Sequence, residues 1–263
     1  MRIMTCNIRT SHAPDGENGW EHRGAFCMEV IRAREPSIFG LQEVSQLQFS
    51  DFTQAFPDYA AHQFRDGSQR DSPTNAVFYQ RDTFDLLSSS GYWLSTSPHV
   101  RGSRGWGSLY VRLANWTRLI ERASGRELRL INTHLDIAGD LTRYRQAIVI
   151  NEDTQGYPDD YPQILTGDMN AAPDSAAIRA YKSAGWLDAW EQVHGDTSAG
   201  FTYHSFKGSQ FENPDMARID YVLVRGPLVA TQVEVLRDHN LTGHYPSDHY
   251  FLVADVEHSE SEP

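Results

Sequence analysis

The chain has 263 residues, of which 40% are hydrophobic and 22% are charged, and this composition is typical of a globular protein rather than a disordered one. Its 23 Lys and Arg side chains stand against 35 Asp and Glu side chains, which gives a formal net charge of −12. Proteins that grip duplex DNA neutralise phosphates with Lys and Arg, so this balance disfavours a general duplex-DNA binder. It suits a protein that binds divalent cations or a small substrate.

No stretch of the sequence is apolar over the roughly 18 residues that a membrane span requires. The residues after Met1 also lack the apolar core of a signal peptide. We therefore expect a cytoplasmic protein that does not insert into a membrane. Cys6 and Cys27 lie in no metal-type spacing, and we expect two buried free thiols in a reducing compartment.

In chain order, the pattern predicts a strand over residues 2–8, a helix over 21–34 that ends before Pro36, a strand over 37–42 and a helix over 47–56. Strands over 76–79, 109–119 and 127–133 follow, then a helix over 141–153, a strand over 163–166 and a helix over 175–183. The last predicted strands cover 218–224, 229–235 and 250–256. This order indicates a mixed-sheet α/β layered fold in a single domain over 1–263, with residues 258–263 as a flexible tail.

Polar side chains of catalytic type stand at or just beyond the ends of these apolar strands. They are Asn7, Glu43, Asn132, His134, Asp168, Asn170, Asp220, Asp248 and His249. Strand ends in a layered α/β domain converge on one rim, and carboxylates packed together there repel each other unless a cation lies between them. A hard ion with oxygen ligands fits this set, so the sequence favours Mg²⁺ or Mn²⁺ over Zn²⁺.

The same fragments, in the same order, resemble the endonuclease/exonuclease/phosphatase superfamily of deoxyribonuclease I-like proteins. The matching motifs are Asn7, Leu-Gln-Glu43, Asn132-Thr-His134-Leu-Asp136, Gly-Asp168-Met-Asn170, Arg218-Ile-Asp220-Tyr221 and Ser247-Asp248-His249. The resemblance implies a four-layer α/β/β/α sandwich of two mixed β-sheets with outer helices. It also implies a divalent-metal-dependent hydrolase of phosphate ester bonds.

Further segments resemble a poorly characterised bacterial branch of this superfamily. They are Gly91-Tyr-Trp-Leu-Ser-Thr, Arg101-Gly-Ser-Arg-Gly-Trp106 and Arg112-Leu-Ala-Asn-Trp116. The branch usually carries His after the Leu-Asp pair and Asp after the Gly-Trp pair. Ile137 and Gly107 occupy these places here, and neither is a core catalytic residue.

The resemblance implies a role for each site residue. Glu43 binds the metal, with Asn7 and Asp248 in or beside its coordination shell. Asp168 orients and deprotonates the attacking water, and Asn170 holds this water or the phosphate. His249 contacts a phosphoryl oxygen while Asp220 fixes its ring, and His134 supplies a second phosphate contact. We expect substrate to be bound by Asn132, Arg112, Trp106 and Arg143.

Two classes of phosphoester substrate remain open, and so does a non-catalytic binding protein of the same fold. The segments 91–116 and 201–211 are rich in aromatic and His residues and are expected to wall off a pocket, which favours a small phosphoester or a short single strand. The alternative is a nuclease or deadenylase on single-stranded nucleic acid, with Tyr92, Trp93, Trp106 and Trp116 available for base stacking. No obligate protein partner is inferred.

Overall fold

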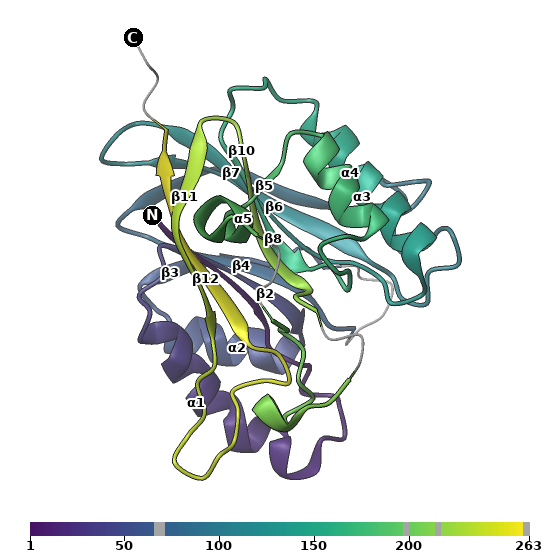
Figure 1. The fold of residues 1–263 in the computed structure, drawn as a ribbon. Coiled ribbons are helices and arrows are strands. Elements are labelled where there is room, and N and C mark those ends of the chain that lie inside the picture. Colours follow the sequence, from purple (N-terminus) through teal and green to yellow (C-terminus); the bar gives the residue numbers. More distant parts are fainter. Residues whose placement is uncertain (66–71, 197–199, 214–216, 260–263) are drawn as a thin grey trace.

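Two six-stranded β-sheets face each other at the centre of the molecule, with helices outside them (Figure 1). The computed structural model describes residues 1–65, 72–196, 200–213 and 217–259. One sheet has the order β11 (Leu228–Leu236), β12 (Phe251–His258), β1 (Arg2–Asn7), β2 (Ile38–Val44), β4 (Thr74–Gln80) and β3 (Tyr59–His62). The other has the order β5 (Phe84–Trp93), β6 (Leu113–Glu121), β7 (Glu127–His134), β8 (Gln163–Asp168), β10 (Asp220–Arg225) and β9 (Leu187–Asp188).

Both sheets are mixed. In the first, β1 runs parallel to β2 and antiparallel to β12; in the second, β7 runs parallel to β8 and the other pairs are antiparallel. Helices α1 (Trp20–Arg32) and α2 (Gln46–Ala55) cover the first sheet, and α3 (Asp140–Thr154) and α4 (Ala176–Ser183) cover the second (Figure 1). The short α5 (Ala189–His194) packs on β10 and β11. The expected four-layer sandwich is confirmed.

The alternating direction of side chains along each strand explains how the layers pack. Ile3 of β1 lies in the core between the sheets, whereas Met4 and Cys6 point to the core beneath α1 and α2. In β8, Ile164 faces the inter-sheet core and Leu165 faces α3 and α4. Because successive side chains of a strand point to opposite faces, a strand with apolar residues at every position can be buried on both faces.

Some elements differ from the sequence prediction. The predicted strand over 109–119 begins only at Leu113, because the backbone before it leaves the sheet to bind the Asp136 carboxylate. The strands β3, β5 and β9 and the helix α5 were not predicted. His258 belongs to β12, where it pairs with Leu228, so the expected flexible tail does not include it. Residues 260–263 of that expected tail lie outside the described residues.

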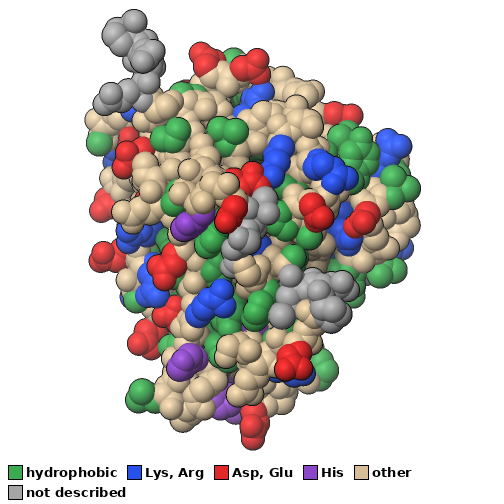
Figure 2. All heavy atoms as spheres, in the orientation of Figure 1, with side chains coloured by type: hydrophobic (Ala, Val, Ile, Leu, Met, Phe, Trp, Pro, Cys, Tyr) green, Lys and Arg blue, Asp and Glu red, His purple; other side chains and the backbone are tan. Residues whose placement is uncertain are grey.

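Acidic and basic side chains are interspersed on the face shown in Figure 2, rather than gathered by sign. No helix in the described part of the chain is long and apolar enough to cross a bilayer. Cys6 and Cys27 are both buried and free, as the sequence predicts.

Candidate active site

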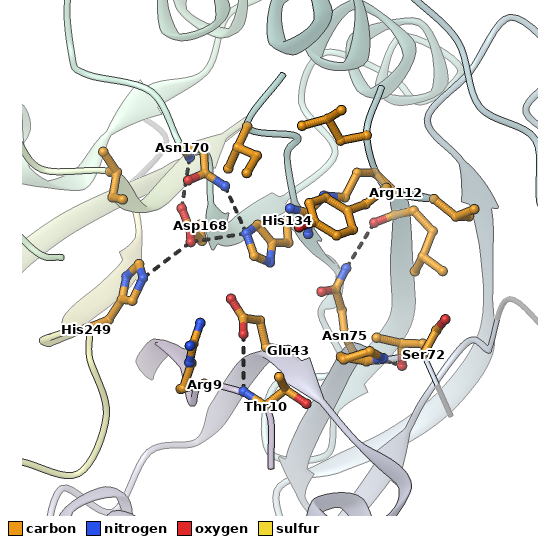
Figure 3. Close-up of a pocket in the computed structure, with 18 of the residues that line it drawn as sticks. Arg9, Thr10, Glu43, Ser72, Asn75, Arg112, His134, Asp168, Asn170 and His249 are labelled. Carbon is orange, nitrogen blue, oxygen red and sulfur yellow. Dashed lines mark hydrogen bonds and ion pairs between the residues drawn. The ribbon is translucent and has the colours of Figure 1, made fainter. Parts of the chain in front are cut away.

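A cavity of about 800 Å³ lies where the ends of both sheets meet, and its floor holds most of the predicted catalytic residues (Figure 3). Its lining includes Glu43, His134, Asp168, Asn170, Asp248 and His249, together with Arg9, Thr10, Asn75, Arg104, Tyr110, Arg112, Ile137 and Tyr203. Asn7 and Asp220 lie just beneath this floor, each bonded to a residue that lines it.

Strand register brings the floor residues together. Within one sheet, His134 at the end of β7 and Asp220 at the start of β10 both pair with Asp168 at the end of β8. In the other sheet, Asn7 ends β1 beside β2, where Gln42 and Glu43 oppose a single residue of β4 in a β-bulge. A bulge redirects the side chain it carries, and this one helps to aim Glu43 into the cavity.

Three residues of the cavity wall have left-handed backbone conformations: Arg9 at φ 50°, Glu43 at φ 62° and Asn170 at φ 47°. Such conformations are uncommon for residues other than glycine, and they concentrate at binding and catalytic sites. Of the three residues, Asn170 tolerates the left-handed conformation best. Its backbone N–H donates to Asp168 Oδ1 at 2.9 Å.

Asp168 is the centre of the cluster. Its Oδ2 accepts from Asn7 Nδ2 at 2.9 Å and lies 3.3 Å from His134 Nε2 and 3.7 Å from His249 Nε2. Burial raises the pKa of Asp168 to about 7, and the nearby Asp220 carboxylate adds to this effect while His249 opposes it. Near neutral pH, Asp168 can therefore take up a proton from a water in the cavity.

His249 and Asp220 form the predicted pair, with His249 Nδ1 lying 2.9 Å from Asp220 Oδ2. Burial alone would lower the pKa of His249, but the Asp220 and Asp168 carboxylates outweigh it and hold this pKa well above its usual value. The ring is thus a fixed imidazolium whose Nε2 side faces the cavity, where it can donate to a phosphoryl oxygen.

His134 carries the opposite protonation state. Burial lowers its pKa well below the usual value, and the positive charges of Arg112 and His249 lower it further. Its Nε2 lies 2.9 Å from Asn170 Nδ2, whose amide also donates to the Leu135 carbonyl at 3.0 Å. A neutral imidazole offers one donor and one acceptor, so His134 can contact either a water or a phosphate.

The donor chemistry of the floor fits a hard divalent cation. Glu43 Oε1 accepts from Asn7 at 3.2 Å, Asp248 faces the same cavity, and burial raises the pKa of Asp248. Asp168 and Asp220 also place one carboxylate oxygen each within 4.8 Å of the other, and Asp220 Oδ1 has no hydrogen-bond partner among the described residues. Carboxylates gathered in this way are stabilised by an ion with oxygen ligands.

Arg112 is the predicted substrate residue that the structure brings to the cavity. Its guanidinium stands 5.0 Å from the Tyr110 ring centroid, and its Nε lies 3.6 Å from Asp136 Oδ2. It donates no hydrogen bond to any residue within the described ranges. A cation placed this way keeps its donors available for a phosphate.

Three other predicted substrate residues do not line the cavity. Asn132 is fully buried between the sheets, where it bonds to backbone carbonyls and to Gln42. Trp106 packs on the core beneath α3, and Arg143 pairs with Asp140 on the surface of that helix. Tyr92, Trp93 and Trp116, which were available for base stacking, also lie away from the lining; the first two are buried.

Several residues of the lining lie outside the motifs described above. Arg9 binds Asp15 through two nitrogens at 3.0 Å and lies 3.7 Å from Asp248. Tyr203 stands edge-on to the His249 ring at 5.2 Å between centroids. Arg9 stands two residues beyond Asn7, so its position just past a strand end could have identified it as a site residue. Tyr203 lies in segment 201–211, which was expected to wall off the pocket, but it was not predicted individually.

The sequence profile of the Endonuclease/Exonuclease/phosphatase family matches residues 4–249 of the chain. The chain belongs to this family. The endonuclease/exonuclease/phosphatase protein from Bacteroides vulgatus superposes with a TM-score of 0.89, at 28% identity and 98% coverage of both chains. A mannosyl-6-phosphatase from Bacteroides thetaiotaomicron gives a TM-score of 0.87, at 25% identity and 98% and 99% coverage.

Among curated sequences, proteins named nocturnin are similar to this chain. The Drosophila melanogaster protein is 26% identical over 93% of this chain, and the Mus musculus protein is 25% identical over 99% of it. The chain spans only 43% and 66% of their respective lengths. The family name covers endonucleases, exonucleases and phosphatases, all of which hydrolyse phosphate esters, and the Bacteroides thetaiotaomicron neighbour is named as a phosphatase.

Proposed function

We propose that the chain hydrolyses a compact phosphate ester with the help of a divalent cation, Mg²⁺ or Mn²⁺, and a water activated by Asp168. The observation that carries the proposal is the convergence of Asp168, two histidines of opposite protonation state and a carboxylate–amide donor set on one cavity floor. The family match supports the reaction class.

Each floor residue has a chemical task in this reaction. Asp168 aligns a water and takes one proton from it, the water oxygen forms a bond to phosphorus, and the bond from phosphorus to the leaving oxygen breaks. The leaving oxygen then takes up a proton. The His249 imidazolium donates to a phosphoryl oxygen as negative charge builds up there, and Asp220 holds its ring in place.

Glu43 and Asp248, with Asn7 beside them, are the residues that would hold the cation. A bound divalent ion offsets the negative charge of the phosphoryl group and lowers the barrier to attack by water. Asn7 Nδ2 donates to Glu43 and Asp168, so this amide holds both carboxylates in place beside the residues that would hold the cation.

A compact ester suits the shape of the cavity. Arg104, Arg112 and Tyr203 line it, and Asn75, also in the lining, donates to the carbonyl of Leu113, next to Arg112, at 3.0 Å. This volume lies within the range of small-molecule pockets. The structural neighbour with the same fold is named a mannosyl-6-phosphatase, and this name supports a compact phosphate monoester here.

A short single strand is the second candidate, and Tyr203 favours it. This side chain is partly exposed beside His249 and packs edge-on against Phe211 at 5.4 Å, so one ring face can stack on a base. The similarity to nocturnin and to a CCR4-Not 3′-5′-exoribonuclease subunit from Emericella nidulans supports the same candidate.

The two buried free thiols suit a reducing compartment, and on this ground we place the enzyme in the cytoplasm. Disulfide formation is the simplest check. A Cys6–Cys27 disulfide in protein purified from its native source under thiol-blocking conditions would contradict this assignment.

The test is a metal-dependent activity screen over sugar phosphates, nucleotides, inositol phosphates, phospholipids and oligonucleotides. We expect EDTA to abolish hydrolysis and Mg²⁺ to restore it. Asp168→Asn should lower kcat by at least ~10²-fold, the usual scale for a general base, whereas Asp174→Asn, an exposed carboxylate outside the cavity, should leave it unchanged. Full activity after exhaustive chelation, or in Asp168→Asn, would contradict the proposal.

A further inference from the structure

Large apolar side chains stand exposed on one wall of the cavity. Leu109 is 58% exposed, Tyr110 54% and Ile137 51%, and all three line the same cavity as Asp168 and His249. Single exposed apolar residues are ordinary on a protein surface, but a cluster at the mouth of a catalytic cavity indicates a surface that is covered in use.

This wall is fixed in place before any ligand arrives. The buried Asp136 carboxylate accepts from Leu109 N at 3.1 Å, from Tyr110 N at 3.0 Å and from Ala138 N at 2.8 Å. It also accepts from Ser108 Oγ at 2.7 Å. One charge thereby ties the loop over 108–110 to the turn over 136–138, so the three apolar side chains keep their spacing without the ordering cost of a mobile loop.

The position of this wall relative to the cavity floor indicates which part of a substrate contacts it. In the proposed reaction the phosphoryl group lies at the floor beside Asp168 and His249, and Arg112, whose guanidinium stands 5.0 Å from the Tyr110 ring centroid, lines the same cavity. Whatever is joined to the phosphorus through the ester oxygen must extend from the floor along a wall. On this wall it meets Leu109, Tyr110 and Ile137, whose side chains offer apolar surface and one aromatic ring.

We propose that Leu109, Tyr110 and Ile137 form a leaving-group subsite, which selects phosphoesters whose leaving group presents an apolar or planar face. The inference rests on the proposed hydrolysis and names its substrate class. A polar leaving group would lose hydration against this wall without finding hydrogen-bond partners on the three side chains, whereas an apolar one gains by burial.

The test compares two monoesters with the same reacting group, 2-naphthyl phosphate and glucose 6-phosphate, in the Mg²⁺-loaded full-length enzyme. The variants are Leu109→Ser and Ile137→Ser. Leu141→Ser is the matched control, since Leu141 is 65% exposed on α3 but does not line the cavity. Thermal melts establish that all three variants fold.

We expect Leu109→Ser and Ile137→Ser each to lower kcat/KM for 2-naphthyl phosphate about tenfold, mainly through KM, the scale set by an apolar pocket contact. The change for glucose 6-phosphate should be smaller than about twofold, and Leu141→Ser should change neither. Equal losses on both esters, or a loss confined to glucose 6-phosphate, would overturn the subsite while leaving the hydrolase intact. A wild-type enzyme inactive on every phosphoester would instead overturn the hydrolase, and the subsite with it.

Discussion

Asp168 sits among groups that set its charge near neutral pH. Because burial raises its pKa to about 7, a proton occupies the carboxylate below this pH and prevents it from accepting one from water. We therefore expect kcat/KM to rise as pH increases toward 7 and to level off above it. A profile measured in Mg²⁺ that stays flat from about pH 5 to 9 would remove Asp168 from the role of base.

The raised pKa of Asp168 also affects the stability of the metal-free protein. The folded-state pKa of Asp168 lies above the unfolded value, so the folded state binds the proton more tightly. This contribution to stability is present at low pH and is lost as pH rises through about 7, where the uncompensated carboxylate benefits most from a cation.

His249 and Asp220 are coupled, but only the imidazole faces the cavity. We expect His249→Ala to lower kcat by about 10²-fold to 10⁴-fold and Asp220→Asn to lower it less, because the asparagine still holds the ring while giving up the charge that keeps it protonated. Single-turnover rates of both variants check this order. If Asp220→Asn were the more damaging change, the imidazole would not be the group that meets the phosphate.

At the scale of the strands, a polar layer joins the two sheets just below the cavity floor. Asn132 of β7 donates to the carbonyls of Leu41 and Ala76, both at 2.9 Å, and its Oδ1 accepts from Gln42 Nε2 at 2.7 Å. Gly40 leaves room for this side chain, since a Cβ there would stand 2.7 Å from Asn132 Oδ1. The Asn132 amide, whose donors and acceptor are all bonded, thus links the two sheets.

We expect Asn132→Ala to lower the free energy of unfolding by about 2 to 4 kcal/mol, because buried groups on both sheets lose their partners. Its KM for any phosphoester should stay close to the wild-type value, since Asn132 does not line the cavity. Chemical denaturation and steady-state kinetics on the same preparation separate the two effects. A raised KM with unchanged stability would return Asn132 to the substrate site.

Sequence patterns located the catalytic floor because its residues follow apolar strands, and strand ends converge in this fold. Glu43 and Asp168 could be found in this way. Segment 91–116 was expected to wall off the pocket, but the place of Tyr110 within that wall could not be predicted. Its backbone is held by the Asp136 carboxylate, 26 residues away in the chain, rather than by local periodicity. Strand β5 escaped prediction for a local reason: it carries a run of serines instead of alternating apolar residues.

At the scale of the whole molecule, charge limits the substrate. The formal net charge is −12, and acidic and basic side chains are mixed on the face seen in Figure 2. We expect specific activity on plasmid duplex to be far below that on small phosphoesters and short oligonucleotides, because long-range attraction to a duplex is missing. Assays at low and moderate salt compare the three substrates. Plasmid cleavage that exceeds cleavage of the two smaller substrates and falls steeply with salt would contradict this preference for small substrates.

The pairing of β1 with β12 also governs when the enzyme becomes active during its own synthesis. Asn7 and His249, about 240 positions apart in the chain, meet only after β12 has been added beside β1. A ribosome adding 5 to 20 residues per second needs roughly 12 to 50 seconds to add the residues that separate the two. Until then the nascent chain lacks Asp248 and His249, so we expect translation products that end before these residues to be inactive.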